Sequence, residues 1–285
     1  MAETPLSLTA ETRIILERYG LAARKSLGQN FLIDRGVLAR IITAADIKKG
    51  DTIVEVGPGP GVLTRALAEK AAKVVAVEID AGLAGSLRET LADLPNVEII
   101  TGDILKTQPE VLVGASPYKV VANLPYYITS PTLRYFLEAP HQPQSLVVMV
   151  QKEVAAQITA RPPEMSLLSL GVQFYGVPKR ISNVPAGCFY PPPKVASSIL
   201  RIDVLPERQL PVEQEKQFFA LARAGFGTRR KQLANALSGG LNLDKAEITA
   251  LLRRADIDPA RRAETLMIEE WLRLLKTWSD ENVQS

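Results

Sequence analysis

The sequence has very few of the residues that build metal sites and thiol chemistry. Its 285 residues include one cysteine, Cys188, and one histidine, His141. A single thiol cannot close an internal disulfide, so we expect a reducing compartment, and a Cys/His metal cluster is excluded. A Cys–His nucleophile pair has one candidate for each partner and is disfavoured. A catalytic centre in this chain must therefore use carboxylates, amides, aromatic rings or a bound cofactor.

Long apolar runs and a strong net charge are also absent. No run approaches the ~20 residues of a membrane span, and residues 1–13 lack the apolar core of a signal peptide. We therefore expect a cytoplasmic protein without a membrane partner. The 34 Lys and Arg stand against 31 Asp and Glu, for a formal net charge of +3. This total neither requires nor excludes nucleic acid, so the distribution of basic residues matters more.

Short β-branched runs alternate with helical stretches in the first part of the chain. Expected strands cover residues 52–56, 73–77, 97–101, 118–122, 145–150, 169–174 and 198–205. Expected helices cover residues 9–19, 34–44, 62–70, 82–91 and 133–138, with Thr9 and Asp34 as N-caps of the first two. Strands that alternate with helices indicate βαβ units and a parallel sheet.

After Pro206 the periodicity is helical throughout. Expected helices cover residues 211–224, 230–237, 245–254 and 268–278. Trp271 and Trp278 are seven residues apart, which predicts one buried helix face that holds both. We expect two domains, an α/β domain over residues 1–205 and a small α-helical domain over residues 206–285.

A glycine-rich turn follows the strand expected at 52–56. Gly57, Gly59 and Gly61 permit close backbone approach to a ligand, and Glu78, at the end of the next strand, suits hydrogen bonds to a ribose diol. The dinucleotide pattern G-x-G-x-x-G is not met, because position 62 is Val62. The intervening prolines lack the amide donors that a pyrophosphate would use. A nucleoside cofactor without phosphates fits better, and we predict S-adenosylmethionine.

Two further strand ends carry polar groups. Asp103 ends the third strand of the series, where it can accept a hydrogen bond from an adenine amino group. Residues 123–126, Asn-Leu-Pro-Tyr, end the fourth. Such residues are also common in ordinary turns that terminate strands. Ligands of open parallel sheets bind beyond the carboxyl ends of the strands, so the succession of these groups favours a single site.

The Asn-Leu-Pro-Tyr segment suits methylation of an exocyclic amine. The lone pair of adenine N6 is delocalised into the ring and is a weak nucleophile. The Asn123 side-chain oxygen and the Leu124 carbonyl can accept its two N–H groups and align it for in-line attack on a methyl group. Tyr126 offers an aromatic face for an extruded base. Catalysis would rest mainly on orientation and polar preorganisation.

The ordered motifs of this chain resemble those of the small-subunit (16S) ribosomal RNA adenine N6-dimethyltransferases. The motifs are residues 28–32 (GQNFL), 54–61 (VEVGPGPG), 77–80 (VEID), 102–103 (GD), 123–126 (NLPY), 151–154 (QKEV), 189–195 (FYPPPKV), 225–233 (GFGTRRKQL) and 257–266 (IDPARRAETL). The resemblance implies a Rossmann-like class I S-adenosylmethionine-dependent methyltransferase fold with a small α-helical C-terminal domain that binds RNA. It also implies that the chain converts two adjacent adenosines in the 3'-terminal hairpin of 16S rRNA to N6,N6-dimethyladenosine. The expected partner is 16S rRNA within the small ribosomal subunit or its precursor, and a monomer without a metal is expected.

The same resemblance assigns roles residue by residue. The residues expected to contact the cofactor are Asn30, Leu32, Gly57, Glu78, Asp103 and Asn123. Those expected to contact the target adenine are Asn123, Leu124, Tyr126 and Phe189, with Phe189 stacked opposite Tyr126. One position departs from the pattern, since Tyr127 stands where the family often has asparagine. This departure affects the expected detail of base positioning.

Basic residues gather in one stretch of the helical region. Residues 216–243 contain Lys216, Arg223, Arg229, Arg230 and Lys231 and no acid. Most charge runs are solvated helix faces. The resemblance favours RNA contacts instead, and we expect Arg229, Arg230 and Lys231 to bind rRNA phosphates.

Three other functions remain open at this stage. A resistance methylase of the same class would act on one large-subunit adenosine, but such enzymes lack the GFGTRRKQL and IDPARRAETL patterns. A transcription or assembly factor of this fold would bind nucleic acid without depending on methylation, although intact Glu78, Asp103 and residues 123–126 argue for activity. A DNA adenine methylase would usually need a dedicated recognition domain, for which the ~80 residues after Pro206 leave little room.

Overall fold

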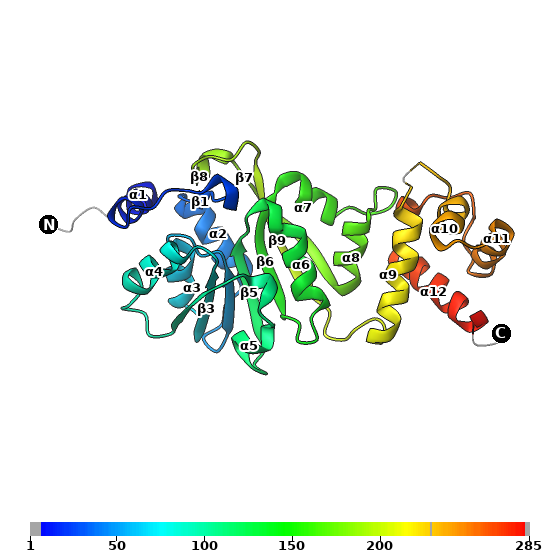
Figure 1. Ribbon diagram of the computed structural model, residues 1–285, viewed down its shortest axis with the longest axis horizontal. Helices are drawn as coiled ribbons and strands as arrows, with labels where there is room; N and C mark the ends of the chain where they lie inside the picture. The colour runs from blue at the N-terminus through cyan, green and yellow to red at the C-terminus, as the bar shows by residue number, and fades with distance from the viewer. Residues whose placement is uncertain (1–6, 229, 283–285) are drawn as a thin grey trace. The chain divides into compact units, whose positions relative to one another are not determined.

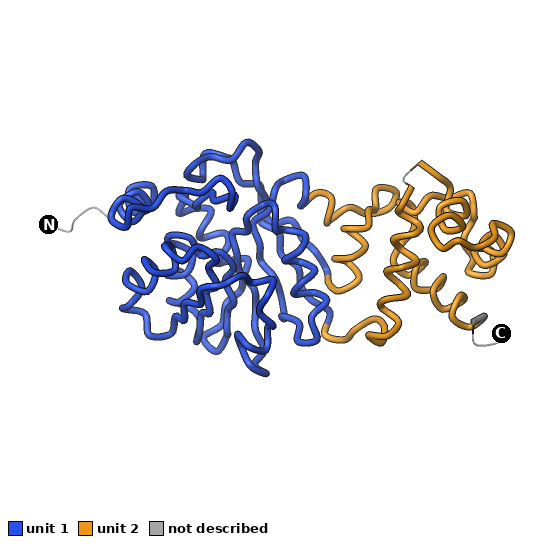
Figure 2. The backbone as a smooth tube through the Cα atoms, viewed as in Figure 1, with its two compact units in different colours: residues 1–155, 177–205 blue, residues 156–176, 206–285 orange. Residues whose placement is uncertain are grey.

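The structure is a computed structural model that describes residues 7–228 and 230–282, without the side chains of residues 281 and 282. The chain divides into two compact units (Figure 2). Unit 1 comprises Met1–Ala155 and Val177–Leu205, and unit 2 comprises Ala156–Gly176 and Pro206–Ser285.

Unit 1 is built on a mixed sheet that is largely parallel (Figure 1). Its strands are β2(Thr52–Val56), β3(Lys73–Glu78), β4(Val97–Thr101), β5(Tyr118–Asn123), β6(Ser145–Gln151), β7(Gly176–Val184) and β9(Ser197–Val204). Among the described residues they follow the order β4-β3-β2-β5-β6-β9-β7. The pairs β4–β3, β3–β2, β2–β5 and β5–β6 are parallel, and β9 runs antiparallel to β6. The predicted α/β fold with parallel βαβ units is confirmed.

The helices of unit 1 are α1(Leu8–Arg18), α2(Arg35–Ala45), α3(Val62–Ala68), α4(Ala81–Thr90), α5(Pro109–Val113) and α6(Thr129–Glu138). The first four begin and end within two residues of the expected positions. Helix α6 begins four residues before the expected position, and α5 was not expected. Asp34 caps α2 as predicted, since its Oδ1 accepts from the Val37 amide at 2.7 Å. Thr9 is not the cap of α1. Ser7 takes that role because its backbone is still extended and its Oγ accepts from the Ala10 amide at 3.2 Å.

A hydrophobic core joins one face of the sheet to α2 and α3. Val37 and Ile41 of α2 and Leu67 of α3 are almost completely buried against strand residues such as Ile53 and Val121. Each fully buried side chain of this kind contributes roughly 1.5–3 kcal/mol of transfer free energy. This core fixes β2 and the turn that follows it, which lie at the functional site.

A second small sheet ties the N-terminal segment to a much later part of the chain. Strand β1(Phe31–Leu32) pairs antiparallel with β8(Phe189–Tyr190), and Leu32 lies opposite Phe189. Two-residue strands carry no periodicity, so the sequence did not predict this pairing. Its consequence is that residues 27–32 are held against the end of the main sheet.

The expected strand at 169–174 is wrong. These residues belong to helix α8(Leu167–Tyr175), and strand β7 follows directly at Gly176. A capping box starts the helix, because Ser166 Oγ accepts from the Ser169 amide at 3.1 Å and Ser169 Oγ accepts from the Ser166 amide at 2.6 Å. The short apolar run fits a strand or a helix equally well, and the cap decides for the helix.

Unit 2 is helical, and among its described residues Gly176, the first residue of β7, is the one that belongs to a strand. Besides α8 it contains α9(Val212–Phe226), α10(Leu233–Leu241), α11(Lys245–Arg254) and α12(Ile268–Asn282), and α7(Lys152–Ile158) crosses its boundary with unit 1. Trp271 is fully buried, as predicted, and a Cβ on Gly225 would come within 2.4 Å of its ring. Trp278 is only partly buried, so the expected two-tryptophan core holds for Trp271 alone.

Unit 2 also differs from the expected domain of residues 206–285 in one segment, since Ala156–Gly176 groups with it. The reason is aromatic packing. The ring of Phe174 stacks on Phe218 of α9 with centroids 4.5 Å apart and meets Phe219 edge-on at 5.2 Å. Such contacts between residues far apart in sequence are invisible to a periodicity argument.

Candidate functional site

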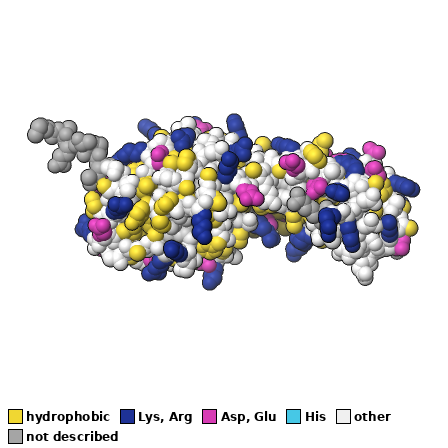
Figure 3. Space-filling view, turned by 90° about the horizontal axis from the view of Figure 1, so that it is seen from above, with side chains coloured by type: hydrophobic (Ala, Val, Ile, Leu, Met, Phe, Trp, Pro, Cys, Tyr) yellow, Lys and Arg dark blue, Asp and Glu magenta, His cyan; other side chains and the backbone are white. Residues whose placement is uncertain are grey.

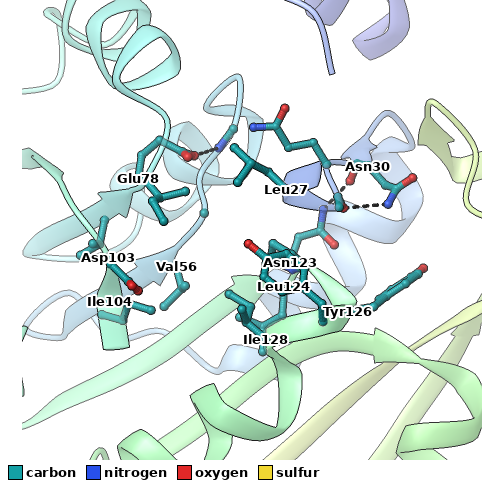
Figure 4. Close-up of a pocket in the computed structure, with 18 of the residues that line it drawn as sticks. Leu27, Asn30, Val56, Glu78, Asp103, Ile104, Asn123, Leu124, Tyr126 and Ile128 are labelled. Atoms are coloured by element: carbon teal, nitrogen blue, oxygen red, sulfur yellow. Dashed lines mark hydrogen bonds between the residues drawn. The ribbon is translucent and has the colours of Figure 1, made fainter. Parts of the chain in front are cut away.

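A cavity of about 280 Å³ lies beyond the carboxyl ends of β2, β3, β4 and β5 in unit 1 (Figure 4). Strands β3 and β4 lie on one side of β2, and β5 and β6 lie on the other. The order of the strands therefore reverses at β2, which is where open α/β sheets bind their ligands. The lining residues are Leu27, Gly28, Gln29, Asn30, Phe31, Val56, Gly57, Gly59, Val77, Glu78, Ile79, Gly102, Asp103, Ile104, Leu105, Asn123, Leu124, Pro125, Tyr126, Tyr127, Ile128 and Phe189.

The turn after β2 forms the floor of the cavity and needs its glycines. Gly57, Gly59 and Gly61 all have positive φ, at 67°, 57° and 88°. A Cβ on Gly59 would lie 2.9 Å from Cδ1 of Phe31, and one on Gly61 would lie 2.7 Å from a methyl of Leu87. Gly57 and Gly59 line the cavity, so the backbone itself faces a ligand there.

Glu78 lies at the end of β3, is 3% exposed, and lines the cavity. Its Oε2 accepts from the Gly59 amide at 3.1 Å and its Oε1 accepts from the Asp80 amide at 2.9 Å. Burial raises the pKa of this carboxyl, and the backbone hydrogen bonds from Asp80 and Gly59 offset part of that rise. The carboxylate is thus held rigidly, and it keeps lone pairs that can accept from hydroxyls in the cavity.

Asp103 follows the neighbouring strand β4 and also lines the cavity. The Leu105 amide donates to its Oδ1 at 3.0 Å, and Lys106 Nζ lies 3.9 Å from its Oδ2. Glu78 pairs in register with Thr101, two residues before Asp103, so both carboxylates are on adjacent strand ends. Figure 4 shows them on one side of the cavity, away from Asn123 and Tyr126.

Asn123 ends β5 on the other side of the cavity. Its Nδ2 donates to the carbonyl of Asn30 at 2.9 Å, and Nδ2 of Asn30 donates to the Gly28 carbonyl at 2.9 Å (Figure 4). The Asn123 side chain therefore donates a hydrogen bond to the N-terminal segment through Nδ2, and its Oδ1 can still accept one. Leu124, the next residue, is 2% exposed and lines the cavity.

Two aromatic residues expected to face a base both line this cavity. Tyr126 is partly buried, and its hydroxyl lies 2.7 Å from Ser197 Oγ. Burial raises the pKa of the Tyr126 phenol. Phe189 is 2% exposed and reaches the cavity from β8. Tyr127, the residue that departs from the family pattern, lines the cavity too and is 55% exposed.

Leu32 is not among the cavity-lining residues. It is 5% exposed and belongs to the hydrophobic core with Val37 and Ile41. Adjacent side chains of a strand point to opposite faces, so Phe31 takes the position on the cavity side. The cofactor contact expected of Leu32 stays a prediction, and Phe31 and Asn30 of the same segment line the cavity.

Several other lining residues were also missed. Leu27, Gly28 and Gln29 belong to the N-terminal segment, which the pairing of β1 with β8 and the Asn123–Asn30 hydrogen bond hold at the cavity. Ile79 and Ile104 each follow one of the two predicted carboxylates. The sequence could have indicated these two residues, because an apolar side chain next to each carboxylate can pack against the faces of a nucleoside.

The expected RNA-binding residues lie in unit 2, in the turn before α10. Arg230 and Lys231 are exposed, and the Lys231 amide donates to the Thr228 carbonyl at 3.0 Å. Arg229 lies outside the described residues. Figure 3 shows many Lys and Arg side chains on the visible surface, with acidic ones interspersed.

The described part of the chain offers neither a metal cluster nor a membrane-spanning helix. No group of three or more His, Cys, Asp or Glu side chains there is placed to hold a metal ion. No helix there is long and apolar enough to cross a membrane.

Comparisons with known proteins agree on one kind of relative. A profile of the family described as "Ribosomal RNA adenine dimethylase" matches residues 20–280. The "Ribosomal RNA small subunit methyltransferase A" of Dehalococcoides mccartyi is 55% identical over 94% of this chain and 92% of its own length. The protein of the same name from Alkaliphilus metalliredigens is 46% identical over 94% of this chain and 96% of its own.

Two solved structures of rRNA-modifying or dimethyladenosine-forming enzymes have a fold similar to that of this chain. A dimethyladenosine transferase from Plasmodium falciparum superposes with a TM-score of 0.77 at 25% identity, covering 88% of this chain and 98% of that one. The 23S rRNA methyltransferase ErmE superposes with a TM-score of 0.71 at 30% identity, covering 88% of this chain and 100% of that one.

Proposed function

The chain belongs to the ribosomal RNA adenine dimethylase family, and from this premise we propose that it dimethylates N6 of two adjacent adenosines in the 3'-terminal hairpin of 16S rRNA. Its fold is that of the class I methyltransferases, with a helical C-terminal region. The methyl donor is S-adenosylmethionine. The substrate is the small ribosomal subunit or its precursor in the cytoplasm, where the chain acts as a monomer in small-subunit maturation.

One observation carries this proposal. A single cavity has two carboxylates, Glu78 and Asp103, on one side and the polar end of β5, with Asn123 and Tyr126, on the other (Figure 4). The first pair suits the adenosine half of a nucleoside cofactor, and the second suits an incoming amine. The reacting groups of a methyl transfer would meet between them.

The residues around the carboxylates fit S-adenosylmethionine. Glu78 is held by two backbone amides and retains acceptor capacity for the ribose hydroxyls. Asp103 accepts from the adenine amino group, and Ile79 and Ile104 cover the faces of the ring. Gly57 faces the ribose and methionine part without a side chain. When bound, the cofactor supplies an electrophilic methyl group on its sulfonium.

The end of β5 positions the target amine. The Asn123–Asn30 hydrogen bond directs Nδ2 away from the amine and leaves Oδ1 to accept one of its N–H groups. The Leu124 carbonyl accepts the other, so electron density is kept on N6 and its lone pair is aligned. No strong base is needed before transfer, because the nitrogen becomes acidic only after it is methylated. Tyr126 and Phe189 hold the flipped base from its two faces.

RNA binding is assigned to unit 2 and to residues 13–25 of the N-terminal segment, which hold four basic residues and one acid, Glu17. Arg230 and Lys231 are exposed, and Arg229 adjoins them in sequence. Phosphate contacts from such residues supply affinity without reading sequence. The choice of the two adenosines therefore depends on the shape of the ribosomal particle and on the cavity.

A second candidate function is methylation of one large-subunit adenosine. It is favoured by the similarity to the 23S rRNA methyltransferase ErmE, at 30% identity. The small-subunit relatives are more similar, at 46% and 55% identity, and cover the chain more fully. The small-subunit assignment is therefore the better supported one.

The test is to map the methylated nucleotides. The purified chain is incubated with labelled S-adenosylmethionine and either unmethylated small subunits or protein-free large-subunit RNA. We expect label on two adjacent adenosines of the 16S 3'-terminal hairpin and none on the large-subunit RNA. Label confined to the large-subunit RNA would establish the second candidate, and label on neither would overturn both.

A further inference from the structure

Ser197 makes a contact that the proposed chemistry does not yet use. It is the first residue of β9, is 0% exposed, and its Oγ lies 2.7 Å from the hydroxyl of Tyr126, 71 residues earlier. Tyr126 lies three residues beyond the end of β5, and Ser197 begins β9. The bond therefore connects the end of β5 to the start of β9 directly beside the cavity.

The hydrogen bond constrains the Tyr126 ring at the end opposite its Cα. A tyrosine ring attached only through Cβ can turn about χ1 and χ2. Tyr126 begins a short 3-10 turn (Tyr126–Ile128), beyond the end of β5. Figure 4 shows the ring extending from the Asn123 side of the cavity with its hydroxyl pointing away from Glu78 and Asp103. An anchor on that hydroxyl determines the tilt of the ring.

Ser197 is itself rigidly placed. Its backbone pairs with Gln151 at the antiparallel junction of β6 and β9. It also ends the segment that starts at Phe189, the other aromatic residue at the cavity. The contact thus links Tyr126 to the start of β9, eight residues after Phe189.

We infer that Ser197 is a positioning residue for the target base, because its hydroxyl holds the Tyr126 ring at the tilt that a flat heterocycle needs between Tyr126 and Phe189. The inference rests on the proposed function, which makes that heterocycle an adenine. Ser197 does not touch the cofactor or the reacting atoms, and it acts through Tyr126 alone. Loss of its hydroxyl should affect the alignment of the base and spare the cofactor.

The adjacent residue offers a matched control. Ser198 is also 0% exposed on β9, and its Oγ donates to Asn183 Oδ1 at 2.9 Å. Successive strand residues point to opposite faces, so Ser198 faces away from Tyr126. Ser198→Ala therefore removes a buried hydroxyl from the same strand without touching the cavity.

The kinetic test compares Ser197→Ala, Ser198→Ala, Tyr126→Phe and the Ser197→Ala/Tyr126→Phe double variant on unmethylated small subunits. Ser197→Ala should lower kcat about five- to tenfold, the effect of losing one net hydrogen bond. Its Kd for S-adenosylmethionine should stay within about twofold of the wild type. The double variant should be no slower than the slower single variant, since both remove the same bond. Ser198→Ala should keep the wild-type kcat.

Unchanged kcat in Ser197→Ala would overturn the inference, and so would equal losses in Ser197→Ala and Ser198→Ala. A crystal structure of Ser197→Ala separates this inference from the proposed function. If the wild type transfers no methyl group, the proposed function fails, while the position of the Tyr126 ring still tests the anchor. A ring that keeps its wild-type tilt without the Ser197 hydroxyl would overturn the inference on structural grounds alone.

Discussion

Asn123 contacts the N-terminal segment that lines the cavity and is also proposed to bind the target amine. Its Nδ2 holds the Asn30 carbonyl, and its Oδ1 is proposed to accept from the target N6. Asn123→Ala should therefore lower kcat by about 100-fold, the scale measured for losing one preorganised hydrogen-bonding group at a reacting centre, and weaken S-adenosylmethionine binding far less. Single-turnover methyl transfer and calorimetry measure the two effects. Full turnover in Asn123→Ala would refute the role assigned to Asn123.

Glu78→Ala is the counterpart on the cofactor side of the cavity and should chiefly raise the Kd for S-adenosylmethionine.

Glu55 is a second buried carboxyl, and its effect should appear in stability. It lies on β2, two residues after Ile53, so it points into the core beside α3. Among the described residues its Oε2 has no hydrogen-bond partner. Burial raises the pKa of Glu55 to about 8, the nearby Thr64 hydroxyl offsets part of the rise, and the charge of Glu78 adds to it.

The pH dependence follows from this raised pKa. Between the ordinary glutamate pKa of 4.5 and about 8, the unfolded chain loses the Glu55 proton while the folded chain keeps it. The Glu55 contribution to the free energy of unfolding is thus fully present below 4.5 and falls as pH rises, by at most about 1.4 kcal/mol per pH unit. Glu55→Gln should flatten the stability profile across this window and be more stable than the wild type at its upper end. Parallel denaturation profiles for the two proteins would contradict the assignment.

At the scale of the element, the glycine turn and the N-terminal segment work together. Gly59 has φ 57°, and an added Cβ would lie 2.9 Å from Phe31. Gly59→Ala should cost about 1–2 kcal/mol of unfolding free energy from the backbone alone and weaken cofactor binding as Phe31 is displaced. Gly50→Ala is the control, because its position is open and its φ is not positive. Denaturant unfolding and calorimetry compare them, and equal effects at both glycines would argue against this contact.

The elements also show what could be predicted from the sequence. Strands at 52–56 and 97–101 match to the residue, because β-branched runs there end in glycine or polar turns. The strand prediction for residues 169–174 was wrong because a short apolar run has no decisive periodicity. The Ser166 cap and the contact of Phe174 with Phe218 favour a helix there. These are tertiary and capping effects, which outweigh local propensity.

The site was predictable where its residues end consecutive strands. Glu78, Asp103 and Asn123 all reach one cavity because parallel strands present their carboxyl ends at one edge. The pairing of β1 with β8 joins segments that lie far apart in the sequence, as the register of Leu32 with Phe189 shows. No pattern along the chain predicts that pairing, so the place of Phe31 at the cavity could not be foreseen.

At the scale of the whole molecule, the near-neutral total makes the location of basic residues decisive. Reversing Arg229, Arg230 and Lys231 to glutamate should weaken binding to small ribosomal subunits. The slope of log Kd against log salt should fall by about 2, because each phosphate that these side chains neutralise contributes roughly 0.7 to it. Cofactor affinity should not change. Binding is measured across a salt series.

The control for net charge reverses three other exposed cations of unit 2, Lys245, Arg253 and Lys276. This variant carries the same change in charge at different places. It should keep most of the affinity for the subunit. Equal weakening in both variants would mean that overall charge, and not the turn before α10, is responsible for binding.

The central claim is that one cavity holds the sulfonium within reach of the end of β5. The most direct measurement is a crystal structure of the chain with S-adenosylhomocysteine. We predict ribose hydroxyls on the Glu78 carboxylate, the adenine amino group on Asp103, and the sulfur facing Asn123. A ligand bound with its sulfur far from Asn123, or outside this cavity, would contradict the proposed function.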